Sequence, residues 1–192
     1  MRTFIAIELD TNVKDKLSAI QKELNNTGAD IRLVEKNNIH ITLRFLGEIN
    51  ENKLSIIKEI LDNTAAEETA FEISINSVGA FANLASIRVV WVGIEKCKER
   101  LIAIADKLNA LLERNNFGKP DKEFLPHITI ARTRSSLNKF RLQECIARNT
   151  VLDLKQTIRG IVLFKSTLTG KGSIYEKLYE VNFKNNETNT IV

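Results

Sequence analysis

Hydrophobic and polar residues recur with two different periods along the chain, and these periods predict its secondary structure. Runs with apolar residues at every second position, or at every position, indicate strands. Apolar residues three and four positions apart indicate helices, as in the series Val13, Leu17, Ile20 and Leu24. We therefore predict strands at 3–9, 39–47, 71–75, 87–95 and 126–130, a short apolar segment at 31–34, helices around 13–24, 54–61, 96–113 and 137–147, and two strands within 157–183 around a glycine-bearing turn at 168–173.

The order of these elements repeats. A shift of 87 positions places Ile5 on Val92, Ile7 on Ile94, Leu24 on Leu111, and the segment 40–42 on the identical segment 127–129. Chance recurrence of common strand and helix patterns is one explanation. A single shift that aligns strands, a helix and a tripeptide instead favours an ancient duplication. We expect two similar lobes that correspond approximately to 2–80 and 87–183.

The two halves should form one structure. No linker rich in proline, glycine or serine separates them, so we expect a single bilobal domain over residues 1–184. The polar segment 185–192 lacks apolar periodicity and is expected to be frayed.

Composition excludes several classes of protein. The 192 residues are 43% hydrophobic and 27% charged, which supports a folded core and is incompatible with a disordered or collagen-like chain. No apolar run approaches the roughly 20 residues that cross a bilayer, and Glu8 interrupts the first apolar run too early for an export signal. Cys97 and Cys145 lack Cys-x-x-Cys spacing, so we expect reduced thiols in a cytoplasmic protein. The formal net charge of +4 permits an RNA or nucleotide partner without requiring one.

The only two histidines of the sequence occur in matching contexts. Each is followed by isoleucine, threonine and a second aliphatic residue, giving His40-Ile41-Thr42-Leu43 and His127-Ile128-Thr129-Ile130. Because alternate residues of a strand share a face, the aliphatic residues can face the core while each histidine shares the other face with its threonine. If a pseudo-twofold axis relates the lobes, the two pairs meet in one cleft.

A pair of imidazoles and a pair of hydroxyls suit in-line phosphoryl transfer. An imidazole with an ordinary pKa near 6.5 acts as a base when neutral and as an acid when protonated. One histidine can take the proton of the attacking oxygen while the other protonates the departing oxygen, and threonine hydroxyls can stabilise the non-bridging oxygens. This scheme requires no metal.

The two motifs resemble the His-x-Thr-x motifs of the two-histidine (2H) phosphoesterases. More narrowly, the chain is similar to the RNA 2',3'-cyclic phosphodiesterases, the family also called 2'-5' RNA ligases. The similarity rests on segments 2–7, 40–48, 125–132 and 163–168 and on Gly172 and Tyr175, in this order, and it covers nearly the whole chain except the tail. Ser173 departs from the family, in which many members have proline at this position, and the difference concerns a turn rather than the chemistry.

The resemblance implies an α+β fold of two similar lobes related by a pseudo-twofold axis, each an antiparallel sheet flanked by helices, with the active cleft between them. It implies hydrolysis of RNA 2',3'-cyclic phosphate ends to 2'-phosphomonoesters, with His40 as proton donor to the leaving 3' oxygen and His127 as proton acceptor from water. Thr42, Thr129 and Arg132 would bind the phosphate. The reverse reaction with a 5'-hydroxyl would form a 2'-5' bond without ATP, as the minor reaction. The implied partner is RNA with cyclic phosphate ends, tRNA-derived RNA included, and we expect a monomer with no cofactor, metal or membrane contact.

Several assignments stay open at the level of sequence. The motifs are nearly symmetrical, so the acid and the base can be interchanged. Phe4 and Tyr175 are candidates for stacking on a base, although aromatic residues of strands usually belong to the core. Arg44 shares the His40 face by simple alternation and is a candidate for substrate binding. One group of cations either guides RNA or only solvates a surface: Arg132, Arg134, Lys139 and Arg141.

Other functions would use the same residues. A non-catalytic module could bind RNA ends without turnover, and an enzyme could act on a small cyclic nucleotide instead of RNA. A two-histidine metal site is a weaker alternative, because neither motif has an obvious third ligand nearby.

Overall fold

The periodic segments form helices and strands close to the predicted positions. The computed structural model describes residues 1–84, 86–149, 152–170 and 172–185. Its strands are β1 (Arg2–Glu8), β2 (Ile31–Leu33), β3 (His40–Glu48), β4 (Phe71–Asn83), β5 (Ser86–Ile94), β6 (His127–Thr133), β7 (Leu154–Ile158), β8 (Gly160–Leu168) and β9 (Ser173–Asn182). Its helices are α1 (Thr11–Asn26), α2 (Leu54–Ala65), α3 (Lys98–Arg114) and α4 (Lys139–Arg148), with short 3-10 turns η1 (Lys36–Asn38) and η2 (Glu51–Lys53). None of the described helices is long and apolar enough to cross a membrane.

Two strand regions differ from the prediction. β4 continues to Asn83, although the alternation of apolar and polar residues ends at Ile75. The pairing of β4 with β5 shifts register between Ile75 and Val78, which breaks the regular period while the ladder continues. β7 was not predicted as a separate strand, because its inward-facing positions include the buried amide Gln156, which interrupts the apolar pattern. In both regions, pairing with neighbouring strands maintains a strand that the local sequence pattern does not predict.

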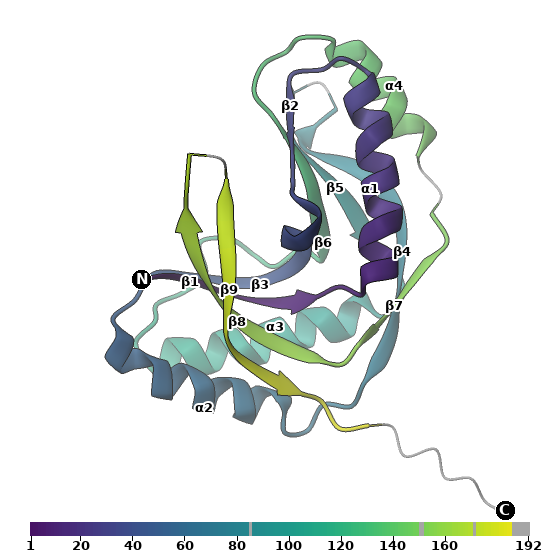
Figure 1. Ribbon diagram of the computed structural model, residues 1–192. Helices are drawn as coiled ribbons and strands as arrows, with labels where there is room; N and C mark the ends of the chain where they lie inside the picture. The colour runs from purple at the N-terminus through teal and green to yellow at the C-terminus, as the bar shows by residue number, and fades with distance from the viewer. Residues whose placement is uncertain (85, 150–151, 171, 186–192) are drawn as a thin grey trace, which may run out of the picture.

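The strands form two antiparallel sheets, each covered on its outer face by two helices (Figure 1). The first sheet has the order β3-β1-β8-β9, and the second has the order β2-β6-β5-β4-β7. α2 and α3 pack on the first sheet, and α1 and α4 pack on the second. The expected α+β fold of two similar lobes is confirmed, because in each sheet the motif strand, β3 or β6, lies beside the strand that precedes its helix, β1 or β5.

Each sheet of the fold separates two environments. Aliphatic side chains on the helix-covered side of both sheets, such as Ile5, Ile7 and Ile128, belong to one continuous core. A smaller cluster lies on the other side of the first sheet and consists of Phe4, Ala6, Val162 and Phe164, with Tyr175 packed against it. This second side is the one that carries the motif histidine of β3.

The lobes do not coincide with the two sequence repeats. β8, from the second half of the chain, pairs with β1, and β4, from the first half, pairs with β5. Strand register also changes the equivalence of residues: Ile7 pairs with Ile41, and Val92 pairs with Ile128. Ile7 therefore corresponds to Val92 in the structure. The fixed shift of 87 positions would instead place Ile7 on Ile94. The two halves therefore repeat the order of their strands and helices, but equivalent residues are not separated by a constant number of positions.

Candidate active site

The two motif strands bring the halves of the candidate site together. β3 and β6 each begin at the motif histidine, and they lie against each other where the two sheets meet (Figure 1). The four aliphatic residues of the two motifs are at most 4% exposed, so they face the core as the alternation predicts. Each histidine and its threonine point to the opposite side, which we call the site face.

His40 is fixed through both of its ring nitrogens. Nδ1 lies 2.7 Å from the carbonyl oxygen of Asn38, and because a carbonyl can only accept, Nδ1 carries a hydrogen and donates it. Nε2 lies 2.8 Å from Thr42 Oγ1. The side-chain amide of Asn38 in turn donates to the carbonyl of Ser173 at 2.7 Å. His40 is therefore held between its own strand and the first residue of β9.

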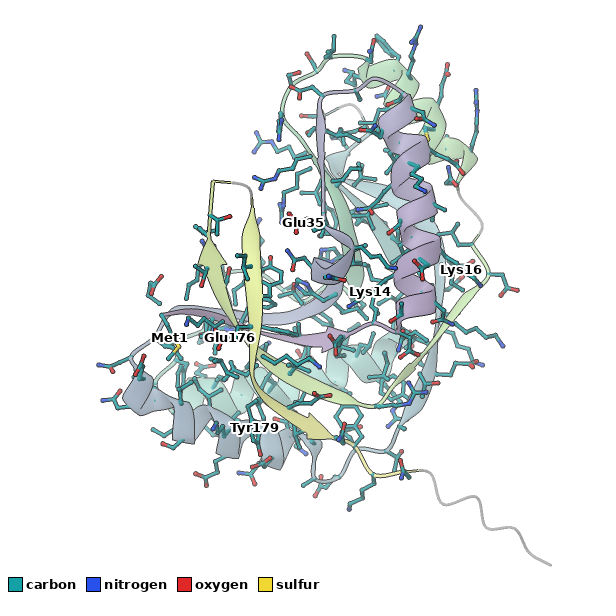
Figure 2. All side chains as sticks on the ribbon, viewed as in Figure 1. Met1, Lys14, Lys16, Glu35, Glu176 and Tyr179 are labelled. Carbon is teal, nitrogen blue, oxygen red and sulfur yellow. The ribbon has the colours of Figure 1, made fainter. Side chains whose placement is uncertain are left out.

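The β8–β9 hairpin also reaches the second sheet. At its tip, a Cβ added to Gly172 would lie 2.9 Å from Nη2 of Arg32 on β2 and 3.2 Å from Oε1 of Glu35. Figure 2 shows Glu35 in the segment after β2, on the side toward this hairpin. Glycine at the tip thus allows the hairpin of one lobe to approach the other lobe next to the site.

Aromatic rings enclose His40 on the site face. Its ring centroid lies 4.9 Å from that of Phe4, 5.5 Å from that of Tyr175, which is edge-on, and 6.5 Å from that of Phe164. Phe4 is 2% exposed, so it supports the imidazole from within the small cluster and has no open face for a base. Tyr175 packs against the cluster and is only half-buried.

These surroundings perturb His40 strongly. Burial lowers the pKa of His40 to about 4, while the hydrogen bond to the Asn38 carbonyl acts in the opposite direction. The positive charges of Lys14 and His127 lower the pKa further. Lys14 lies on the buried face of α1, 3.9 Å from Oε1 of Glu8 (Figure 2). The contribution of His127 indicates that the two imidazoles share one electrostatic environment.

His127 repeats the anchor of His40 in a more open setting. Its Nδ1 donates to the carbonyl of Leu125 at 2.6 Å. Leu125 lies two residues before His127, just as Asn38 lies two residues before His40. Its ring meets Phe81 edge-on at 5.0 Å. Burial lowers the pKa of His127, the Leu125 carbonyl opposes this, and the charge of Arg132 lowers it further. Within the described part of the chain, no hydrogen bond joins His127 to Thr129.

A β-bulge in each motif strand determines which cation faces the site. On β6, Trp91 pairs with Thr129 and Val89 with Arg132, with a register shift between them, so Arg132 returns to the face of Thr129. On β3 the same irregularity pairs Ile5 with Arg44.

Arg44 consequently lies on the helix-covered side, and not on the His40 face that simple alternation indicates. It is 6% exposed and donates from Nη2 to the carbonyls of Gly118 at 3.0 Å and Phe117 at 3.4 Å, beyond the end of α3. Phe45 takes the position on the site face, paired with Phe4, and is 61% exposed. The β1–β3 register thus determines that Phe45, and not Arg44, lies on the site face.

Sequence reasoning also missed Trp91 and Phe81. Trp91 lies beside Thr129 on β5, and its indole covers Gly79, where an added Cβ would lie 2.4 Å from the ring. Phe81 packs on the indole at 5.3 Å between centroids. The signal available in the sequence is Gly79 itself, since a glycine within a strand often marks a close approach by another group.

No group of three or more histidine, cysteine, aspartate or glutamate side chains in residues 1–84, 86–149, 152–170 and 172–185 is arranged to hold a metal ion. Cys97, which immediately precedes α3, and Cys145 in α4 are both free thiols.

Two carbonyl-anchored imidazoles paired with threonines, at the meeting line of two similar lobes, are the features expected of a two-histidine phosphoesterase. The model of the LigT-like phosphoesterase family matches the sequence twice, over residues 7–91 and 92–175. The chain belongs to the LigT-like phosphoesterase family.

Individual relatives agree with this assignment. The RNA 2',3'-cyclic phosphodiesterases of Methanocaldococcus jannaschii and Methanothermobacter thermautotrophicus are 37% and 33% identical to the chain over 181 and 176 residues. The alignments cover 94% and 91% of this chain and 99% and 95% of those proteins. A crystal structure of a Thermus thermophilus protein matches with a TM-score of 0.82 at 26% identity, covering 97% of this chain and 100% of that one. Escherichia coli LigT complexed with 3'-AMP has the same fold, with a TM-score of 0.77 at 22% identity, covering 95% of this chain and 97% of that one.

Proposed function

We propose that this protein hydrolyses the 2',3'-cyclic phosphodiester at the 3' end of RNA and leaves a 2'-phosphomonoester. The observation that carries the proposal is the placement of two His-x-Thr motifs on adjoining strands, each imidazole anchored through Nδ1 to a backbone carbonyl. The relatives from the two methanogens, which carry the name RNA 2',3'-cyclic phosphodiesterase, support RNA ends as the substrate class.

In this reaction a water oxygen attacks phosphorus while the bond from phosphorus to the 3' oxygen breaks. His127 takes a proton from the water at Nε2, and His40 gives a proton from Nε2 to the departing 3' oxygen. His40 must therefore react in its protonated form. The hydrogen bond to the Asn38 carbonyl favours that form, and so does the negative charge of a bound phosphodiester, because both stabilise an imidazolium.

The phosphate itself is bound by hydroxyl and guanidinium groups. Thr42 and Thr129 donate to the non-bridging oxygens, with Thr42 turning its hydroxyl from His40 Nε2 to the substrate. Arg132, on the same face as Thr129, adds positive charge. Tyr175 contacts the terminal nucleoside at the rim. Arg44 takes no part, because it lies on the other side of the sheet.

The reverse assignment of acid and base is the alternative within this mechanism. Its support is the low pKa of His40, about 4, which makes His40 neutral in the free protein at neutral pH. A substrate with sulfur in place of the leaving 3' oxygen decides between them, because a thiolate departs without a proton. With His40 as the acid, this substrate restores activity to His40→Ala and leaves His127→Ala inactive. The opposite pattern would exchange the two roles.

The proposed activity is tested with a short RNA that ends in a 2',3'-cyclic phosphate, incubated with the protein in excess EDTA. The expected product is a terminal 2'-phosphate, formed by the wild type and by neither His40→Ala nor His127→Ala. A 3'-phosphate would show that the ring opens in the other direction. Binding without turnover would favour a non-catalytic RNA-end module, and loss of activity in EDTA would favour a metal site.

The same assay addresses ligation and substrate size. With an excess of RNA bearing a 5'-hydroxyl, we expect a 2'-5' linkage as a minor product, since water competes for the same phosphorus. A nucleoside 2',3'-cyclic phosphate turned over faster than RNA would favour a small cyclic nucleotide as the substrate.

We further propose that the protein acts in the cytoplasm as a monomer without a cofactor, on RNA ends that include tRNA-derived ones, and that residues 1–184 form one bilobal domain. Light scattering after size-exclusion chromatography tests the monomer. Limited proteolysis tests the domain, which is expected to resist cleavage within residues 1–184. The segment 185–192, expected from the sequence to be frayed, lies outside the described residues except for Asn185.

A further inference from the structure

A second surface begins where β6 leaves the active site. Beyond Arg132 the strand ends at Thr133, and the following loop borders a cavity of about 450 Å³. The residues that line the cavity include no acidic side chain. Three of them are cations, Arg88, Arg134 and Lys139, and four carry hydroxyls: Ser86, Thr133, Ser135 and Ser136. We call this cavity the basic groove.

The arginines of the basic groove are not neutralised by neighbouring side chains. Arg88 and Arg134 are exposed, and neither forms an ion pair with any residue that the structure describes. Asp30 is the acidic residue nearest to Arg134 by strand pairing, but the contact is made by its backbone carbonyl, which accepts from the Arg134 amide at 2.8 Å. By contrast, Arg148 at the end of α4 lies 3.7 Å from Glu144. Uncompensated arginines beside hydroxyl groups are suited to phosphate oxygens.

An aromatic ring stands at the rim of the groove. Phe140 is 76% exposed, and the Nζ atom of Lys139 lies 5.5 Å from its ring centroid. Lys139 lines the basic groove as well as a second hollow of about 450 Å³ that Phe140 and Arg141 border. A phenylalanine this exposed contributes nothing to the core, and its free face can stack on a nucleic-acid base.

The groove lies at the end of β6 opposite His127, on the strand that carries half of the site. β6 carries His127, Thr129 and Arg132 on the site face, and its next residues enter the groove. From Thr129 to Arg134 an antiparallel strand spans roughly 17 Å. A cyclic phosphate held at the histidines would therefore place the preceding nucleotides, a few phosphates away, at Arg88 and Arg134.

We propose that the basic groove binds the phosphodiester backbone of the RNA that leads to the cyclic end, with Phe140 stacking on one of its bases. This inference rests on the proposed function and extends it, because it makes single-stranded RNA a better substrate than a cyclic mononucleotide. The groove takes no part in the bond-breaking step.

The test compares two substrates in one double variant, Arg88→Ala with Arg134→Ala. For a ten-nucleotide RNA with a cyclic end, kcat/KM is expected to fall about tenfold at low salt, and the slope of its logarithm against the logarithm of salt concentration is expected to become shallower by roughly one per arginine. For a nucleoside 2',3'-cyclic phosphate, kcat/KM should stay at the wild-type value. Phe140→Ala should reduce only the activity on RNA, and the matched control Arg148→Ala should reduce neither.

An equal loss on both substrates, or no loss on RNA, would overturn the proposal. A binding measurement separates this failure from failure of the proposed function. The Kd for the same RNA ending in a 2'-phosphate, measured by fluorescence anisotropy, is expected to rise about tenfold in the double variant whether or not the wild type turns over any substrate. An unchanged Kd would refute the groove independently of catalysis.

Discussion

The two histidines of the site share a sequence context and a backbone anchor, but their surroundings differ. His40 is enclosed by three aromatic rings, bonds Thr42 and has its pKa lowered to about 4. His127 meets Phe81 edge-on, and its pKa is also lowered, again chiefly by burial. The anchors differ as well: Asn38 is tied to β9, whereas Leu125 is 55% exposed.

One motif therefore gives two imidazoles in different environments. The motif fixes Nδ1 and presents Nε2, and the neighbouring elements then set the proton affinity of each ring. In the free protein both histidines resist protonation, and His40 does so more strongly because it is more buried. Neighbours outside the motif therefore break the symmetry that the duplicated sequence provides.

Removal of either imidazole is expected to have the largest effect. His40→Ala and His127→Ala should each lower kcat/KM on cyclic-phosphate RNA by about 10³-fold, because proton transfer at one end of the reaction loses its catalyst. Circular dichroism serves as the control for folding. A folded variant that kept activity within tenfold of wild type would show that its histidine is neither the acid nor the base.

Loss of a motif hydroxyl should lower activity less than loss of a histidine, and the effects of the two threonines should differ. Thr42→Val and Thr129→Val keep the side-chain shape but remove a donor to the phosphate, so kcat should fall about 10²-fold in each. Thr42→Val also removes the partner of His40 Nε2, so it alone should move the pH profile of kcat/KM. Serine at either position should restore activity, and wild-type rates in both valine variants would rule out phosphate binding by these residues.

The tether of His40 to the β8–β9 hairpin should have a smaller effect. Asn38→Ala keeps the carbonyl that anchors Nδ1 but loses the bond to Ser173, so the anchor becomes less well placed. We expect kcat to fall about tenfold with little change in KM, together with a shifted pH profile. Asn37→Ala, at the exposed neighbouring position, is the matched control. A loss in KM alone would assign Asn38 to substrate binding instead of positioning.

The smallest expected effect is on stability as a function of pH. The pKa of His40 is about 4 in the folded protein against an ordinary 6.5, so between these values the unfolded chain binds a proton that the folded chain does not. Stability should therefore decrease as pH falls from 6.5 to 4 and should not depend on His40 above that window. His40→Asn should remove on the order of 1 kcal/mol of this destabilisation at pH 5, measured by urea unfolding. An equal or larger effect of His127→Asn would contradict the difference between the two sites.

The sequence predicted the placement of the motif residues better than that of the residues around them. His40, Thr42, His127 and Thr129 follow from alternation within one strand each, and the burial of their aliphatic neighbours confirms that alternation. The location of Arg44 could not be predicted, because a bulge reverses the face of a residue and the bulge exists only in the pairing with β1.

The sequence was sufficient to predict the positions of most helices and strands, but not which strands pair with one another. The periods located the helices and most strands, because each period depends on residues close in sequence. The pairing of Ile5 with Leu163 depends on segments far apart in the chain, and no local pattern specifies it. Trp91 and Phe81 were missed for the same reason, since they reach the site from β5 and β4 across strand neighbours.

The exchange of β4 and β8 between the sheets governs how the chain can fold. β1 cannot complete its ladder until a strand about 160 residues later has returned to it, and contacts over such a long sequence separation slow folding. Either half alone would leave an open strand edge, so we expect one cooperative unfolding transition for the whole chain instead of two. Because the two histidines come from different halves, a nascent or cleaved chain has no complete pair of motif histidines until both halves have joined.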